Sequence, residues 1–395
     1  MFYDDERNVP DLLDVLVSRS NQWKHIKLEV DPKGSRKSDW QSIRGQLDKL
    51  TSLSIDCVTG EWDFDEPFLS IFEEAPCLRS IGLHDGPART DLILPWHQLE
   101  TVHLSGCEIE RALHILKDCA SAVRVTLEML MEHLFFTEDA IHLVLPNIKT
   151  LSVIVNPPMV VSKLFHYLTL PGIETLEIRH NSIVNWNAPW DISSLLGALR
   201  RSPLRSITSL ALTEMVLAYE DITSLLEITP NVEKFFFTEF APGIKPKTEP
   251  ENLTITPLLL ARLSLIDSYF PLATPIPNGA RLLPRLKHLF LRVHAKNLDQ
   301  WALVKAIISR CPGIDGMTGP EVAAFNDAEN RLRSLEVVVM APDGKPSLEL
   351  LSSLKYLSDT GMSVQVKAEI TEYELHEISE VSEQEVDMDD DSNDE

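Results

Sequence analysis

The sequence of 395 residues predicts an α/β solenoid, with a curved parallel sheet on its concave side and helices on its convex side. The first observation is a six-position frame, apolar-x-x-apolar-x-apolar, that recurs along almost the whole chain. The second is its spacing: the middle residues Leu151 and Leu176 lie 25 residues apart, enough for one strand and one helix. The third is that amphipathic stretches at helical spacing separate the copies. Together they predict about twelve irregular repeats over residues 1–368.

The clearest copy of the frame spans residues 173–183 and continues as x-x-Asn-x-apolar, so that Asn181 falls in a turn after the strand. This pattern is the strand-and-turn half of a leucine-rich repeat. Apolar residues at alternate positions predict a short strand with one buried face. Asn181, and Cys107 in the matching turn, are expected to hold backbone groups of the bend. The predicted frames begin at Trp23, Leu50, Leu78, Leu99, Ala122, Ile148, Ile173, Ile207, Val232, Leu260, Leu286 and Leu332.

Helices are predicted between the frames, where apolar residues recur at i, i+3, i+4 and i+7. Prolines near the ends of these stretches, such as Pro203 and Pro230, stop each helix before the next strand. A helix over 347–357 and a short strand over 362–366 are expected to close the array. The predicted helical stretches are 12–17, 68–72, 109–116, 160–168, 192–199, 222–228 and 301–308.

Three stretches interrupt the repeats, and their polar, proline-rich composition predicts surface loops at 240–257, 268–281 and 312–330. Beyond the last strand, residues 369–395 contain 13 Asp and Glu and no Lys or Arg. Low apolar content and high charge predict a disordered acidic tail over 369–395.

Composition excludes several classes of function. The net charge of −24 and the pI near 4.9 argue against a nucleic-acid partner, because phosphate binding needs a basic face. Five cysteines without a C-x-x-C pair fit a reducing intracellular compartment, the cytoplasm or the nucleus. No apolar run approaches the roughly 18 residues of a membrane helix, so no membrane partner is expected.

No motif of the sequence indicates catalysis. The 12 histidines are scattered without metal-ligand spacing, and neither a glycine-rich phosphate loop nor a nucleophile elbow is present. We therefore expect no metal, no cofactor and no catalytic residues, and a chain that is not an enzyme.

Frame positions 3, 5 and 7 are expected to point to the concave face, opposite the core positions. The N-terminal strands place small groups there, such as Ser54 and Gly82. Exposed aromatic residues next to arginines are typical of binding hot spots, although the aromatic rings could instead pack under the 240–257 loop. The candidate binding residues are Arg179, Lys234, Phe236, Arg262, His288, Phe290 and Arg292.

A cationic concave patch on an acidic protein predicts a protein or peptide ligand that is acidic or phosphorylated. The chain's own acidic tail is the alternative occupant of the same patch. Either contact should weaken steeply as salt is added.

Strand starts of the form Leu-Pro-x-apolar, at Leu145, Leu170 and Leu283, accompany an opening segment that runs from Leu16 to Leu28. Over roughly residues 8 to 367 the chain resembles the leucine-rich-repeat region of F-box proteins of mushroom-forming fungi. The resemblance implies the substrate-recognition subunit of a Skp–cullin–F-box ubiquitin ligase. A Skp-type adaptor is then expected as partner only if an F-box lies upstream, because no Leu-Pro-x-Glu-Ile-Leu type start is visible.

Two other functions fit the same fold. The first is a stand-alone leucine-rich-repeat scaffold without a ligase link. The second is a GTPase-activating repeat protein, since the Ran-directed kind also ends in an acidic tail. That family has an asparagine turn in its repeats throughout, whereas only Asn181 matches here.

Overall fold

The computed structural model describes most of the predicted repeats and parts of their connections. The described residues are 15–30, 41–57, 68–84, 93–130, 142–155, 158–180, 190, 192–202, 206–215, 217–239, 254–265, 281–295, 298–311, 331–341, 352–354, 357–358 and 361–370. The loop predictions at 240–253, 268–280 and 312–330, the Asn181 turn and the tail beyond Ile370 therefore lie outside the described residues.

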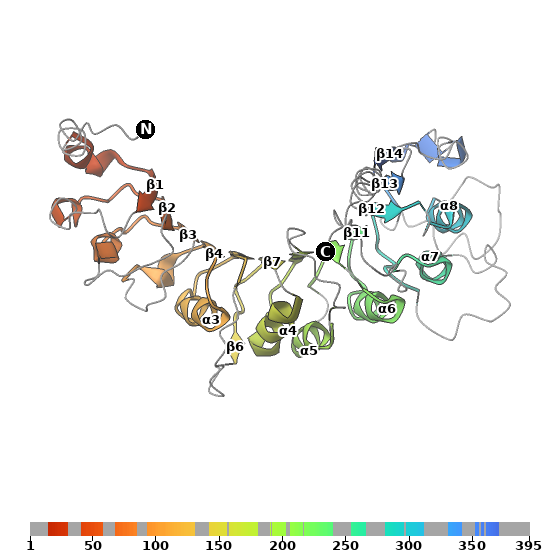
Figure 1. The fold of residues 1–395 in the computed structure, drawn as a ribbon, viewed down its shortest axis with the longest axis horizontal. Coiled ribbons are helices and arrows are strands. Elements are labelled where there is room, and N and C mark those ends of the chain that lie inside the picture. The colour runs from red at the N-terminus through yellow and green to blue at the C-terminus, as the bar shows by residue number, and fades with distance from the viewer. Residues whose placement is uncertain are drawn as a thin grey trace, which may run out of the picture. The chain divides into compact units, whose positions relative to one another are not determined.

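The chain forms two compact units, which are described separately. The N-terminal unit comprises Met1–Asn181 with Asp191–Ile207, and the C-terminal unit comprises Ser182–Trp190 with Thr208–Glu395. In each unit the strands are parallel and follow one another across the sheet in chain order. Helices cover one face of each sheet (Figure 1). This confirms the α/β leucine-rich-repeat architecture within each unit.

The sheet of the N-terminal unit has the order β1-β2-β3-β4-β5-β7-β9. Short 3₁₀ helices precede several of its early strands, and a separate pair, β6 and β8, lies outside the main sheet. The bounds are η1 Ser20–Gln22, β1 His25–Val30, η2 Gln41–Ile43, β2 Ser52–Cys57, η3 Phe68–Phe72, β3 Ser80–His84, η4 Trp96–Gln98, β4 Thr101–Ser105, α3 Ile109–Asp118, β5 Arg124–Glu128, β6 Leu143–Val144, β7 Thr150–Val155, α4 Pro158–Tyr167, β8 Leu168–Thr169, β9 Thr175–His180 and α5 Ser193–Arg201.

The sheet of the C-terminal unit has the order β10-β11-β12-β13-β14. Its last strand, β14, is longer than the predicted closing strand and includes Glu369. The bounds are β10 Ser209–Met215, α6 Tyr219–Ile228, β11 Lys234–Glu239, α7 Pro257–Leu263, β12 His288–His294, α8 Gln300–Ile308, β13 Ser334–Ala341 and β14 Ser363–Ile370.

Register explains why the frame predicts the strands. Core positions of neighbouring repeats pair directly, so that Leu53 faces Ile81 and Leu151 faces Leu176. The same rule pairs Phe235 with Leu289 in the C-terminal unit. Each of these side chains is at most 3% exposed. Stacked apolar rows of this kind bury the face that no single repeat could cover alone.

One predicted frame is wrong. The residues from Leu260 to Leu265 were expected to begin a strand, but Leu260 and Leu263 lie on helix α7. Pro257 occupies the first helical turn, and the Thr256 side chain accepts a hydrogen bond from the Leu259 N–H at 3.1 Å. An apolar pair three residues apart fits a helix as well as the frame, and this N-cap favours the helix.

Backbone hydrogen bonds connect consecutive repeats just before most strands of the main sheets. The carbonyl of Lys24 accepts the N–H groups of both Thr51 and Ser52, at 2.8 and 3.1 Å. The carbonyl of Lys287 likewise accepts the N–H groups of Arg333 and Ser334, at 2.7 and 3.1 Å. This shared acceptor is a feature of both units, and it aligns each strand with the one before it.

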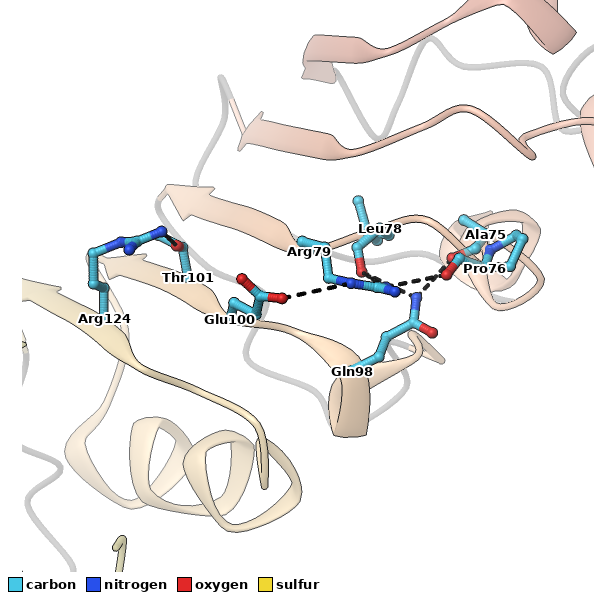
Figure 2. A network of polar contacts seen from close by, with 8 residues as sticks. All are labelled: Ala75, Pro76, Leu78, Arg79, Gln98, Glu100, Thr101 and Arg124. Carbon is cyan, nitrogen blue, oxygen red and sulfur yellow. Dashed lines mark hydrogen bonds and ion pairs between the residues drawn. The ribbon is translucent and has the colours of Figure 1, made fainter. Parts of the chain in front are cut away.

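Side chains add further contacts at the same level of the N-terminal unit (Figure 2). The Gln98 amide donates to the carbonyls of Ala75 and Leu78, at 2.8 and 3.0 Å. The Arg79 guanidinium donates to the Leu78 carbonyl at 3.0 Å and lies 3.7 Å from the Glu100 carboxylate. Gln98 thus satisfies carbonyl groups of the turn in the repeat before its own.

Candidate recognition surface

Strands β10 to β14 present one face opposite the described helices α6, α7 and α8, and we call it the exposed face of the C-terminal unit (Figure 1). Its side chains alternate with buried ones along the whole of β12 and over the first four residues of β11 and β13, as a period of two requires. The residues used below are Lys234, Phe236, His288, Phe290, Arg292, Glu336, Lys367 and Glu369.

Two aromatic rings pair on this face. Register places Phe236 directly opposite Phe290, and their ring centroids are 6.0 Å apart with an interplanar angle of 33°. Phe236 is 37% exposed, whereas its neighbours Phe235 and Phe237 are fully buried. Phe236 and Phe290 therefore lie side by side on the exposed face. Of the 240–257 loop, which could cover the rings, residues 240–253 lie outside the described residues.

Arg292 is not an unpaired cation. Its Nε lies 2.6 Å from a carboxylate oxygen of Glu369 on β14, and Nη1 lies 3.9 Å from Glu214 on β10. Glu214 has a left-handed φ of 58°, and its N–H donates to the Thr238 hydroxyl at 2.7 Å. Two carboxylates from strands on either side thus compensate the guanidinium.

The exposed face is consequently mixed in charge rather than cationic. Besides the partners of Arg292, the Lys367 ammonium on β14 lies 2.5 Å from the Glu336 carboxylate on β13. The prediction of a cationic patch did not include these acidic partners. They are distant in sequence, since Glu369 follows Arg292 by 77 residues.

His288 lies at the start of β12, in the most cationic part of this face. Its Nδ1 is 2.8 Å from the Ser334 hydroxyl on β13. Desolvation lowers the pKa of His288, and the charges of Lys234 and Arg333 lower it further. The nearby Lys287 ammonium is paired with Glu233 at 2.7 Å. Neutral imidazole is therefore favoured here, because the surroundings are already positive.

The remaining two predicted binding residues lie elsewhere. Arg262 was expected on the concave face, but it is on helix α7, is 8% exposed and pairs with Glu227 at 2.7 Å. This placement was wrong because the strand frame at Leu260 is a helix. Arg179 is exposed on β9 and belongs to the N-terminal unit.

The corresponding face of the N-terminal unit carries small residues and a histidine pair. The rings of His84 and His103 pack edge to face with centroids 4.8 Å apart, and His103 Nε2 lies 3.2 Å from the Glu128 carboxylate. A side chain at Gly82 would contact both the His84 ring and the Ser54 hydroxyl at 3.4 Å. The sequence analysis did not identify this cluster, although Ser54, Gly82 and His103 share frame position 5 and His84 and Glu128 share frame position 7.

Groups capable of metal or nucleophilic chemistry are not assembled in the described residues. No group of three His, Cys, Asp or Glu there could hold a metal ion. Burial raises the pKa of Cys107 and of Cys311 to about 11 and that of Cys119 to about 12, so their thiols stay protonated at neutral pH. Within the described ranges, none of the helices is both long and apolar enough for a membrane span.

Comparison with known proteins finds similarity among solved structures. No protein-family model matches the sequence, and no curated protein matches it. Among solved structures, the leucine-rich repeat-containing protein LegL7 from Legionella pneumophila is similar, with 15% sequence identity and a TM-score of 0.39. The match covers 87% of this chain and 94% of that chain. We base the fold class on the strand register and the repeats described above.

Proposed function

We propose that this chain is a protein-recognition module that acts by binding rather than by catalysis. The observation that carries the proposal is the Phe236–Phe290 pair, because two adjoining aromatic rings on an open sheet face can anchor a partner. Aromatic side chains bury large areas at low entropic cost and dominate binding hot spots. Paired charges around them, such as Arg292 with Glu369, provide the polar rim of such an interface.

The ligand that we propose is an acidic or phosphorylated segment of another protein. The wider role that we propose is substrate recognition in an F-box-type ubiquitin ligase. Support for the ligase role comes from the sequence resemblance alone. Its partner would be a Skp-type adaptor bound through an F-box.

The recognition proposal is tested by comparing partners captured by the intact chain and by matched double variants. Phe236→Ala with Phe290→Ala removes the aromatic pair, whereas Ser52→Ala with Ser54→Ala changes the equivalent face of the N-terminal unit. Affinity capture followed by mass spectrometry should identify proteins that are lost only with the aromatic variant. If both variants retain the same set of partners, the aromatic pair is not the recognition site.

The ligase proposal is tested separately with a purified Skp-type adaptor. Size-exclusion chromatography of the mixture should give a joint peak if the chain contains an adaptor-binding segment. If no joint peak forms with the chain or with a longer natural form of it, the stand-alone scaffold is favoured.

A further inference from the structure

We infer that Lys234, His288 and Arg333 bind an anionic side chain of an extended partner segment, while Phe236 and Phe290 receive an apolar side chain two residues away. The anion is a carboxylate or a phosphate. This inference rests on the proposed function and assigns the two chemical groups of the ligand to two adjoining parts of one surface.

The sheet brings the cations Lys234 and Arg333 and the neutral His288 together. Lys234 on β11 pairs with His288 on β12, and His288 pairs with Ser334 on β13. Arg333 immediately precedes Ser334. Neighbouring strands are about 4.8 Å apart, and Lys234 and Arg333 both lie close enough to His288 for their charges to act on it, so the three groups are within reach of one anion. We call Lys234, His288 and Arg333 the cationic corner.

The two cationic side chains of this corner are available. Lys234 and Arg333 are both exposed, and within the described part of the chain neither forms an ion pair. The contrast is with Lys287 and Arg292, which are engaged by Glu233 and Glu369. An incoming anion would therefore displace no carboxylate at the cationic corner, but would have to displace one at Arg292.

Electrostatics at His288 supports the same location. Among the described residues, three cations, Lys234, Arg333 and Lys287, lower the pKa of His288, and Glu233 raises it. The other groups that face it are Ser334 and the partly exposed Phe290 side chain, which carry no charge. A bound anion would reverse this balance and favour protonation of the imidazole, adding a third charge-assisted donor.

Strand geometry sets the spacing of the ligand. Phe236 follows Lys234 by two residues on β11, and Phe290 follows His288 by two residues on β12. Residues two apart on a strand share a face and are about 6.6 Å apart along it. An extended ligand has the same repeat, so its residues i and i+2 can reach the cationic corner and the aromatic pair together. The ligand pattern is thus an anionic residue, any residue and an apolar residue, in either chain direction.

The test uses fluorescein-labelled pentapeptides of sequence glycine, anionic residue, alanine, phenylalanine, glycine, and their reversed forms. The anionic residue is phosphoserine or glutamate, and serine and glutamine probes are the neutral controls. Fluorescence anisotropy with the full chain should show about tenfold tighter binding of an anionic probe than of its neutral control in at least one direction. Phosphoserine and glutamate probes distinguish the two sources of the anion.

Variants then locate the contact. Lys234→Gln with Arg333→Gln should abolish the preference for the anionic probe, whereas Lys149→Gln in the N-terminal unit should preserve it, with circular dichroism checking that each variant is folded. Equal binding of charged and neutral probes, no binding of any probe, or loss of the preference in Lys149→Gln alone would overturn the inference. The proposed function would survive each of those results if partner capture still depended on the aromatic pair.

Discussion

The two units share one repeat and differ on the face opposite the helices. Along one row of the N-terminal unit the side chains are small or polar, and Ser54, Gly82 and His103 are register partners. The corresponding row of the C-terminal unit pairs Phe236 with Phe290. Both rows alternate with equally buried apolar rows. Stacking of the repeats requires an apolar side chain only at every second strand residue. The residues between these point to the opposite face and can vary, so that face can acquire a binding site.

A buried arginine is expected to distinguish the units most strongly. Arg310 in the C-terminal unit is 1% exposed and donates to the carbonyls of Leu263, Leu282 and Leu283 at 2.7 to 2.9 Å. Arg201 in the N-terminal unit donates to three carbonyls of the α4 end, but it is exposed. If Arg201 is removed, water can hydrogen-bond the carbonyls that it contacted. Water cannot do the same for the buried carbonyls around Arg310.

Replacement of these arginines by methionine should therefore have unequal effects. We expect Arg310→Met to lower the free energy of unfolding by about 3 to 5 kcal/mol, since buried carbonyls lose their donors. Arg201→Met should cost about 1 kcal/mol. Urea unfolding followed by circular dichroism measures both, and equal losses would contradict this account. Burial lowers the pKa of Arg310 to about 9, so the wild-type guanidinium is charged at neutral pH.

Two glycines give the next largest difference. A Cβ at Gly172 in the N-terminal unit would lie 2.3 Å from the Pro146 carbonyl oxygen, so backbone would have to move. Gly361 in the C-terminal unit has a φ of +87° and open space around it. We expect Gly172→Ala to cost about 2 kcal/mol through overlap and Gly361→Ala about 1 kcal/mol through backbone strain. Thermal unfolding measures both costs. A smaller loss of stability in Gly172→Ala than in Gly361→Ala would show that the backbone near Pro146 moves away from the new Cβ without cost.

Ion pairs should contribute less, and in a salt-dependent way. Arg292→Gln removes the contact to Glu369, in which the guanidinium is 24% exposed, and should cost below about 1 kcal/mol. Lys149→Gln in the N-terminal unit breaks a more exposed pair with Glu174 and should cost less. Both losses should shrink as NaCl is raised from about 0.05 to about 0.5 M, because salt screens exposed charges. If the stability lost in either variant increased with salt, the side chain would stabilise the fold by something other than its ion pair.

The smallest expected effect is a shared dependence on pH. Desolvation lowers the pKa of His142 in the N-terminal unit and of His288 in the C-terminal unit. The unfolded chain then takes up these protons first as pH falls below about 6.5, so each histidine contributes a loss of stability in that window. Tm measured at about pH 7 and about pH 5 should fall less in His142→Gln and in His288→Gln than in the wild type.

Features that depend on a local, periodic pattern of residues could be predicted from the sequence. Apolar rows such as Leu151 with Leu176 are local and periodic, so the strands that carry them were predicted correctly. The frame at Leu260 failed because the Thr256–Pro257 cap decides between helix and strand. Candidate binding residues on strands were placed on the expected face, as for Phe236 and Phe290.

Charge balance could not be predicted in the same way. The frame gives the direction of Arg292, but its partners Glu214 and Glu369 come from strands two positions away on either side. The bulge that turns Glu214 toward Arg292 has no pattern in the sequence. Arg333 was missed because it precedes the alternating part of its strand, where the frame assigns no direction to a side chain.

The carbonyl that accepts two N–H groups before most strands has an evolutionary consequence. Its donors and acceptor are all main-chain atoms, and the acceptor residue varies freely: Lys24, Thr51, Arg79, Glu100 and Val123 all serve. A junction that ignores side-chain identity lets a gene gain, lose or exchange single units without rewriting the flanking ones. Diversification of such a chain can therefore proceed by shuffling of segments as readily as by point substitution.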